Sequence, residues 1–302
     1  MRIAYIILAH KLPEQFARLV RKLNTENALF LIHIDKKTDS ETYRRMTESL
    51  RAYKNVRLLD RLVCNYGDFN HVKATLEGIK EVIASSFQYD YVILLTGQDY
   101  PIKTNGYIQK VLEESDKKSY IEYFPLPSSE HWKDENGGLD RLNYWHFNFF
   151  GCSIAIPRRN RSTKSFLDPM WSTLSRILPT RRRLPLNYKL FGGSAYWCLS
   201  RDHIEYLDKF VRENAGFVRF FWHVLLPEEI FFQTILLNSP FGDRLVNDNL
   251  RCINWSGTWH PDVFRLEDFK VLAKTDCLFA RKFDISVDAE VLDKIDQATR
   301  DY

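Results

Sequence analysis

The chain has 302 residues, 45% of them hydrophobic and 27% charged, with a formal net charge of +4. A chain of this length can bury a large core, and the composition excludes a disordered protein, because it combines ample apolar content with little charge excess.

Short apolar runs alternate with helical patterns along the first 110 residues. We expect strands within residues 2–10, 28–35, 55–60 and 89–101, and helices from Pro13, over residues 40–53 and over residues 69–86. Alternation at the spacing of βαβ units predicts an α/β fold, a doubly wound and mostly parallel sheet flanked by helices.

Polar clusters follow three of the expected strands, at His10–Lys11, residues 33–36 and Gly97–Asp99. The carboxyl ends of parallel strands meet at one edge of a sheet, where ligands bind in such folds. No G-x-G-x-x-G follows the first strand and no P-loop motif occurs in the chain. Nothing therefore supports a dinucleotide dehydrogenase or a P-loop enzyme.

The second half of the chain is less regular. We expect strands within residues 120–126, 135–150 and 191–200, and helices over residues 201–214 and 227–238. Glu228 and Glu229 then lie at the start of the last helix, where acids favour the positive end of the helix dipole. No composition shift divides the chain, which predicts one domain over 1–302, with a nucleotide-binding half, 1–110, and an acceptor and catalytic half, 111–302.

Nine basic residues and one acid, Asp168, lie between Pro157 and Lys189. The simplest interpretation is a solvated loop; the functional one is contact with an anionic membrane surface or acceptor through the segment from Arg158 to Lys189. We expect no nucleic-acid partner, because no basic and aromatic recognition module accompanies this segment.

The five cysteines are widely spaced and form no C-x-x-C pair, which indicates reduced thiols. The N-terminal apolar run is too short to span a bilayer and has no signal-peptide cleavage site. We therefore predict a cytoplasmic protein, peripheral to the inner face of the membrane if the basic segment binds lipid.

Several segments together resemble the core-2/I-branching β-1,6-N-acetylglucosaminyltransferases and the related peptide O-xylosyltransferases. The similarity extends from about residue 2 to residue 297, and its most specific segments are GQDYPIKTN, PEEIFFQTILLNSP and LFARKFD. The resemblance implies a GT-A-like fold with an irregular C-terminal acceptor portion, and inverting transfer from a UDP-sugar without a metal or other cofactor. The chain contains no D-x-D motif, the usual anchor for a divalent ion at the diphosphate.

The resemblance assigns the chemistry to two residues. The family motif Pro-Asp-Glu corresponds to Pro227-Glu228-Glu229, which makes Glu229 the general base, while Glu228 is a helix-start residue or a second functional acid. Lys282 in LFARKFD stabilises the leaving UDP. A second cation is expected on the diphosphate; we favour Arg251 over Arg265, and Arg281 is the weaker alternative.

The remaining predicted contacts divide between donor and acceptor. The residues expected to bind the UDP-sugar, besides Arg251 and Lys282, are His10, Asp35, Asp99 and Ser194. Those expected to bind the acceptor are Arg141, Tyr196 and Trp255, with Trp259 competing with Trp255 for one role.

The sequence thus predicts a UDP-sugar-dependent glycosyltransferase that moves GlcNAc or xylose onto a glycan hydroxyl, free or lipid-linked. The alternative is a nucleotide-sugar or glycan-binding module without activity. A metal-dependent transferase that uses isolated acids is a third possibility.

Overall fold

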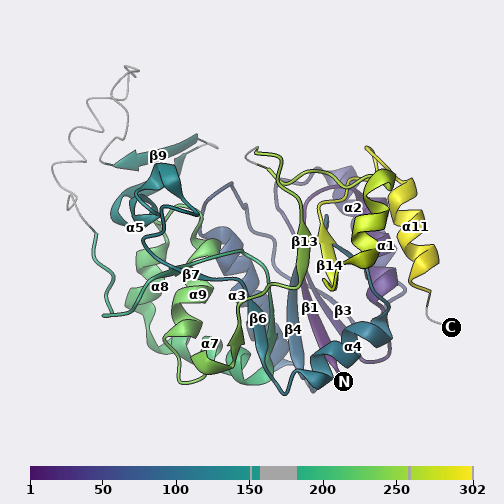
Figure 1. Cartoon of the computed structure of the whole chain (residues 1–302), viewed down its shortest axis with the longest axis horizontal. Helices are drawn as coiled ribbons and strands as arrows, with labels where there is room; N and C mark the ends of the chain where they lie inside the picture. The colour runs from purple at the N-terminus through teal and green to yellow at the C-terminus, as the bar shows by residue number, and fades with distance from the viewer. Residues whose placement is uncertain (150–151, 157–181, 258–259, 301–302) are drawn as a thin grey trace.

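A computed structural model describes residues 1–149, 152–156, 182–257 and 260–300 (Figure 1). Its main sheet has seven strands in the order β12-β6-β11-β4-β1-β2-β3. The strands are β1 (Ile3–Ala9), β2 (Ala28–Ile34), β3 (Val56–Leu58), β4 (Tyr91–Thr96), β6 (Ser119–Ile121), β11 (Trp197–Ser200) and β12 (Leu245–Val246). Only β11 runs against its neighbours, β4 and β6. This confirms the predicted α/β fold with a mostly parallel sheet.

The central strands are buried on both faces, as their continuous apolar runs predict. Alternate residues of β1 enter different cores: Tyr5 and Ile7 pack on one side of the sheet, and Ala4 and Ile6 on the other. Close approach of α3 (Asn70–Ala84) to the second face requires glycine at 78, since a Cβ there would lie 2.9 Å from the Ile6 side chain.

Helices cover both faces of the sheet (Figure 1). One side carries α1 (Pro13–Leu23), α2 (Ser40–Leu50), α4 (Asn105–Glu114), α10 (Phe269–Lys274) and α11 (Glu290–Ala298). The other carries α3, α7 (Arg201–Glu213), α8 (Ala215–Phe221) and α9 (Phe231–Leu237). Pro13 stands in the first turn of α1, as predicted, where its missing N–H has no intrahelical partner to lose.

Short elements are added around the main sheet. A three-stranded sheet joins β5 (Tyr100–Pro101), β13 (Arg251–Ile253) and β14 (Phe279–Arg281). Two antiparallel pairs join β7 (Phe124–Pro125) with β10 (Phe191–Gly192), and β8 (Trp145–Phe149) with β9 (Cys152–Ile156). The remaining turns are α5 (Leu139–Asn143), η1 (Lys133–Glu135), η2 (Pro227–Glu229), η3 (Gly242–Arg244) and η4 (Leu266–Asp268).

Two features differ from the sequence-based expectations. The main sheet extends beyond the first 110 residues, because β6, β11 and β12 of the second half add to its β4 edge. The predicted helix over residues 227–238 is two pieces, the 3₁₀ turn η2 and the helix α9, separated by Ile230 at φ −133°. Within the described ranges, every helix falls short of the length and apolarity required to cross a membrane.

Candidate active site

The turn η2 fixes Glu228 and Glu229 through contacts with two separate loops. The amide of Leu226, a residue in the left-handed region at φ 49°, donates to the carbonyl of Gly67 over 3.1 Å. The amide of Gly193 donates to the carbonyl of Glu229 over 2.9 Å. Because η2 is separate from α9, the two acids do not begin the single helix that was predicted over residues 227–238.

Glu229 pairs with a buried arginine. Arg141, 7% exposed, donates from Nη1 to Oε2 of Glu229 over 2.6 Å and from Nε to Glu135, and its guanidinium stacks on Trp132. Burial raises the pKa of Glu229, and the charge of Arg141 partly offsets that effect. Burial lowers the pKa of Arg141, but Glu229 and Glu135 raise it by more. Arg141 therefore stays charged and orients Glu229, whereas we expected it to bind the acceptor.

Glu228 has different surroundings. Its Oε2 is buried and finds no hydrogen-bond partner in the described part of the chain. Burial and then the charge of Glu229 raise the pKa of Glu228 to about 8. A carboxyl group in this environment is mostly protonated at neutral pH, so it can donate as well as accept a hydrogen bond.

A cationic cluster lies beside the carboxyl end of β4. Arg281 donates from Nη1 to Thr96 Oγ1 over 3.0 Å and to Asp99 Oδ1 over 3.2 Å, and its guanidinium lies 4.4 Å from the Tyr196 ring centroid. Asp99 is completely buried and also accepts from the amide of Thr96. Its carboxylate is thus occupied within the protein, and it orients Arg281 instead of presenting itself to a sugar hydroxyl.

Lys282 is half-buried directly after Arg281. Burial, followed by the charges of Arg281 and Lys11, lowers the pKa of Lys282. Lys11 pairs with Asp284 over 3.1 Å, whereas no carboxylate of the described residues lies within ion-pair distance of the Lys282 ammonium. Three cations from β14 and the end of β1 therefore gather at one edge, which favours an anionic ligand there.

The first two strands contribute His10 and Asp35, as their positions predict. His10 is an exposed residue. Partial burial of its ring, and then the charge of Lys11, lowers its pKa. Asp35 is 7% exposed and accepts from the amide of Lys37 over 2.8 Å. The charge of Asp35 acts on His10, so the two side chains are neighbours at this edge.

Arg251 is buried close to the cationic cluster, with its guanidinium 5.7 Å from the centroid of the same Tyr196 ring. It is 6% exposed, and its guanidinium donates to the carbonyls of Leu94, Asn249 and Trp197. The guanidinium group therefore makes its hydrogen bonds to backbone oxygens of β4, of β11 and of the residues before β13. We therefore leave Arg251 out of the proposed donor site, because a buried guanidinium with backbone partners is not available to a diphosphate.

The other predicted contacts lie around the Gly-rich turn before β11 and after β13. Ser194 accepts from Gln233 through its carbonyl over 2.7 Å, and its hydroxyl accepts from the amide of Tyr196. Tyr196 covers Arg281, on the donor side, although we expected an acceptor role. Trp255 is 57% exposed and free to form a stacking face, while Trp259 falls outside the described residues.

Most of the predicted membrane segment, residues 157–181, also falls outside the described residues. Arg182 belongs to the same basic stretch but is buried, where it donates to the carbonyls of His223, Leu142 and Tyr144 and stacks between Trp145 and Phe220. Arg182 therefore stabilises the fold and cannot contact a membrane.

Sequence patterns missed three contributors to this site: Tyr66, Glu135 and Trp132. Tyr66 is 64% exposed; burial of part of its ring and then the charge of Glu229 raise its pKa, and the charge of Arg141 partly offsets that effect. It therefore lies beside the acids with a face open to solvent. Within the described chain, no group of three or more His, Cys, Asp or Glu side chains has metal-site geometry.

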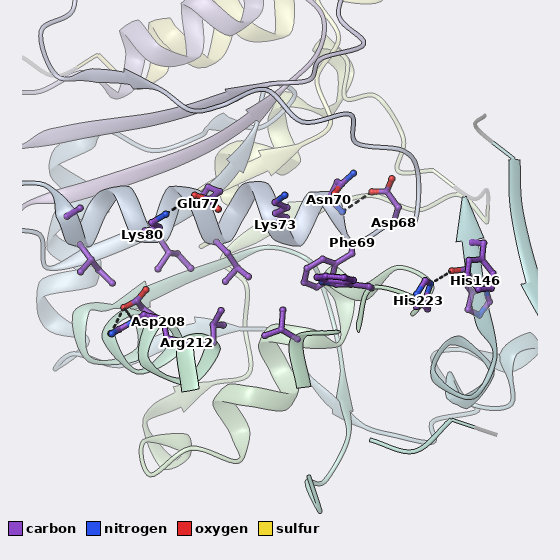
Figure 2. Close-up of a pocket in the computed structure, with 18 residues that line it drawn as sticks. Asp68, Phe69, Asn70, Lys73, Glu77, Lys80, His146, Asp208, Arg212 and His223 are labelled. Carbon is purple, nitrogen blue, oxygen red and sulfur yellow. Dashed lines mark hydrogen bonds and ion pairs between the residues drawn. The ribbon is translucent and has the colours of Figure 1, made fainter. Parts of the chain in front are cut away.

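A groove of about 980 Å³ runs along α3 (Figure 2). Its far rim carries two ion pairs, Glu77 with Lys80 at 3.6 Å and Asp208 with Arg212 at 2.8 Å. Its other end lies at Asp68, whose charge reaches Glu228. The groove contains none of the predicted site residues.

Comparison with known proteins gives one family. Residues 3–273 match the family model described as Core-2/I-Branching enzyme. The chain is 29% identical over 320 residues to xylosyltransferase 2 of Rattus norvegicus and of Homo sapiens, and 26% identical to xylosyltransferase 1 of Pan troglodytes. These matches cover 98% of this chain and 33%, 33% and 30% of the relatives, so the chain spans about a third of their length.

Among solved structures, one similar chain is the 4-diphosphocytidyl-2C-methyl-D-erythritolsynthase from Anaerococcus prevotii DSM 20548. The TM-score is 0.34 at 12% identity, over 71% of this chain and 75% of that one.

Proposed function

Because this chain belongs to the Core-2/I-branching enzyme family, whose members are glycosyltransferases, we propose that it transfers GlcNAc or xylose from a UDP-sugar to a glycan hydroxyl with inversion. The observation that carries this proposal is the meeting of an oriented carboxylate and a cationic cluster. Arg141 holds Glu229, and the charge of the adjacent Glu228 acts on Tyr196. The Tyr196 ring centroid lies 4.4 Å from the guanidinium of Arg281, which Lys282 follows directly.

Inverting transfer requires a base that removes the acceptor proton as the hydroxyl oxygen attacks the anomeric carbon. We assign this role to Glu229, because Arg141 holds its Oε2 at 2.6 Å and the charge of Arg141 opposes the rise in its pKa that burial causes. Its Oε1 then accepts the proton from the acceptor. A base positioned in this way contributes roughly 10²- to 10⁴-fold to the rate.

The UDP leaving group develops negative charge as the glycosidic bond breaks. Lys282 is the cation that we assign to this charge, with Lys11 beside it. Arg281 adds a third positive charge to this edge, and its guanidinium is oriented by contacts with Asp99 and Tyr196. Preorganised cations of this kind stabilise a departing phosphate without reorganisation during the reaction. His10 and Asp35 lie at the ends of β1 and β2, where the nucleotide would bind.

The test is a panel of UDP-sugars with the wild-type chain and Glu229→Gln, measured with and without EDTA. We expect transfer by the wild type in EDTA, and a loss of about 10²-fold or more in kcat with Glu229→Gln while UDP still binds. Full activity of Glu229→Gln would contradict the assignment of the base. Loss of turnover in EDTA would indicate a metal-dependent transferase, and UDP binding without turnover by the wild type would indicate a binding module.

A further inference from the structure

The two adjacent acids of η2 face different partners. Glu229 pairs with Arg141 and is affected by Glu135 and Glu122. These three residues belong to the segments between β6 and β8, in the half expected to bind the acceptor.

Glu228 faces the other half of the site. Burial, with a contribution from the charge of Glu228, raises the pKa values of Cys64 and Tyr196. Cys64 belongs to the loop between β3 and α3, and Tyr196 covers Arg281, which is followed directly by Lys282. The charged and titratable groups that face Glu228 are Glu229, Asp68, Arg141, Cys64, Tyr66 and Tyr196.

The buried oxygen of Glu228 is an unsatisfied polar atom inside the candidate site. Buried carboxyl oxygens in folded proteins nearly always have a hydrogen-bond partner, and Oε2 of Glu228 has none in the described ranges. Asp99, in contrast, is completely buried and makes its bonds within the protein, to Thr96 and Arg281. Glu228 is therefore the carboxyl group whose partner must come from a ligand or from water.

The expected position of the transferred sugar indicates which ligand could bind Glu228. In the proposed reaction, the sugar lies between the leaving diphosphate at Lys282 and the base Glu229. Glu228 is next to Glu229 in the chain, and its charge acts on Tyr196, whose ring centroid lies 4.4 Å from the guanidinium of Arg281. Sugar hydroxyls donate and accept hydrogen bonds, which matches a carboxyl group that lacks a partner.

We propose, on the basis of the function inferred above, that Glu228 binds a hydroxyl group of the donor sugar and so contributes to donor recognition, whereas Glu229 acts on the acceptor. Glu228 is then a binding residue for the transferred pyranose and not a helix-start residue. A site that hydrogen-bonds a substrate hydroxyl discriminates strongly against ligands that lack it, because the buried group is left unpaired.

The experiment compares UDP with UDP-xylose and UDP-GlcNAc by calorimetry, using the wild type, Glu228→Ala and Glu228→Gln. We expect the wild type to bind one UDP-sugar more tightly than UDP. Glu228→Ala should lose that advantage by about tenfold or more while its affinity for UDP is unchanged. Glu228→Gln retains a donor and an acceptor, and should restore most of the advantage.

Steady-state kinetics then separate the two acids. Glu228→Ala should raise the KM for the donor and leave the KM for the acceptor unchanged, whereas Glu229→Gln should lower kcat and leave UDP-sugar binding intact. Thermal unfolding of each variant verifies that it folds. Glu228→Ala that keeps the wild-type preference for UDP-sugar over UDP would overturn the inference, as would equal weakening of both ligands. A wild type that binds neither UDP nor UDP-sugar would overturn the proposed function itself, and the inference with it.

Discussion

The guanidinium of Arg141 donates from Nη1 to Oε2 of Glu229 over 2.6 Å, across 88 positions of the chain. The same guanidinium binds Glu135 and stacks on Trp132, so one buried cation serves two carboxylates. The protonation state of Glu229 therefore depends on the balance between Arg141 and Glu135.

This balance predicts opposite pH effects for two substitutions. Arg141→Met removes the charge that lowers the pKa of Glu229, so the acidic limb of the kcat profile should move to higher pH by about one unit or more. Glu135→Gln removes a charge that raises the pKa of Glu229, so the limb should move to lower pH. Activity is measured from pH 5 to 9. Shifts in the same direction for both variants would exclude Glu229 as the titrating base.

Candidate residues that follow a strand end could be located from the sequence, and the roles assigned to them stay predictions. Asp35 and Lys282 each follow directly on a strand, and strand ends can be identified from the apolar runs that precede them. The same reasoning recovered the central sheet, because β1, β2 and β4 are buried on both faces and read as continuous apolar runs.

Contacts between residues far apart in the chain could not be predicted from the sequence. Arg251 looks like a surface cation in a short strand, yet it bonds to backbone carbonyls of β4 and β11. Arg281 was the weaker candidate for the second cation on the diphosphate, but Asp99, 182 positions away in the chain, orients its guanidinium. Neither contact leaves a local pattern in the sequence, since both depend on which strands become neighbours.

The Gly193 turn offers a test of how η2 is held. A Cβ at residue 193 would lie 1.9 Å from the carbonyl oxygen of Glu122, so the backbone would have to move. Because the Gly193 amide also holds Glu229, Gly193→Ala should lower both the free energy of unfolding, by about 1–3 kcal/mol, and kcat.

Gly216→Ala is the matched control, because a Cβ there meets no atom within 4 Å and the residue lies inside α8. It should stabilise the protein by about 0.5–1 kcal/mol and leave kcat unchanged. Urea denaturation and initial rates measure both effects. Wild-type activity and stability in Gly193→Ala would show that this turn does not constrain η2.

The ion pair between Asp99 and Arg281 predicts strong coupling in stability. Asp99 is fully buried and the Arg281 side chain is 13% exposed, so removal of one partner leaves a charge with reduced solvation. Asp99→Asn and Arg281→Met should each cost about 3–5 kcal/mol in the free energy of unfolding. The double variant should cost clearly less than the sum, as measured by urea denaturation. Additive losses would mean that the two side chains stabilise the fold independently.

Lys282 and Lys11 should differ in their contribution to UDP binding. Lys282→Ala removes a cation that forms no ion pair with a carboxylate of the described residues, so UDP affinity should fall by about tenfold or more. Lys11→Ala should have a smaller effect, because Lys11 already pairs with Asp284.

Lys110→Ala, in α4, is the control for a general change in charge, since Lys110 is 68% exposed and pairs with Glu114. Calorimetry at two salt concentrations measures all three variants. Equal losses for Lys110→Ala and Lys282→Ala would argue against a local phosphate contact at Lys282.

The thiols of Cys252, in β13, and Cys277, two residues before β14, are joined by a hydrogen bond. The hydrogen bond from Cys252 lowers the pKa of Cys277 to about 6, although burial opposes this shift. Burial raises the pKa values of Cys64 and Cys198. Since the thiolate is the reactive form, iodoacetamide at pH 7 should modify Cys277 before Cys64 and Cys198.

Peptide mass spectrometry across a pH series gives the midpoint for alkylation of Cys277. In Cys252→Ala the hydrogen bond is lost, so the midpoint should move upward from about 6, toward the ordinary range of a thiol. Alkylation of Cys198, which is buried away from this pair, should be unchanged in the same variant and reports on whether the fold is intact. A midpoint for Cys277 that stays near 6 without Cys252 would assign its reactivity to another neighbour, such as the Thr275 hydroxyl.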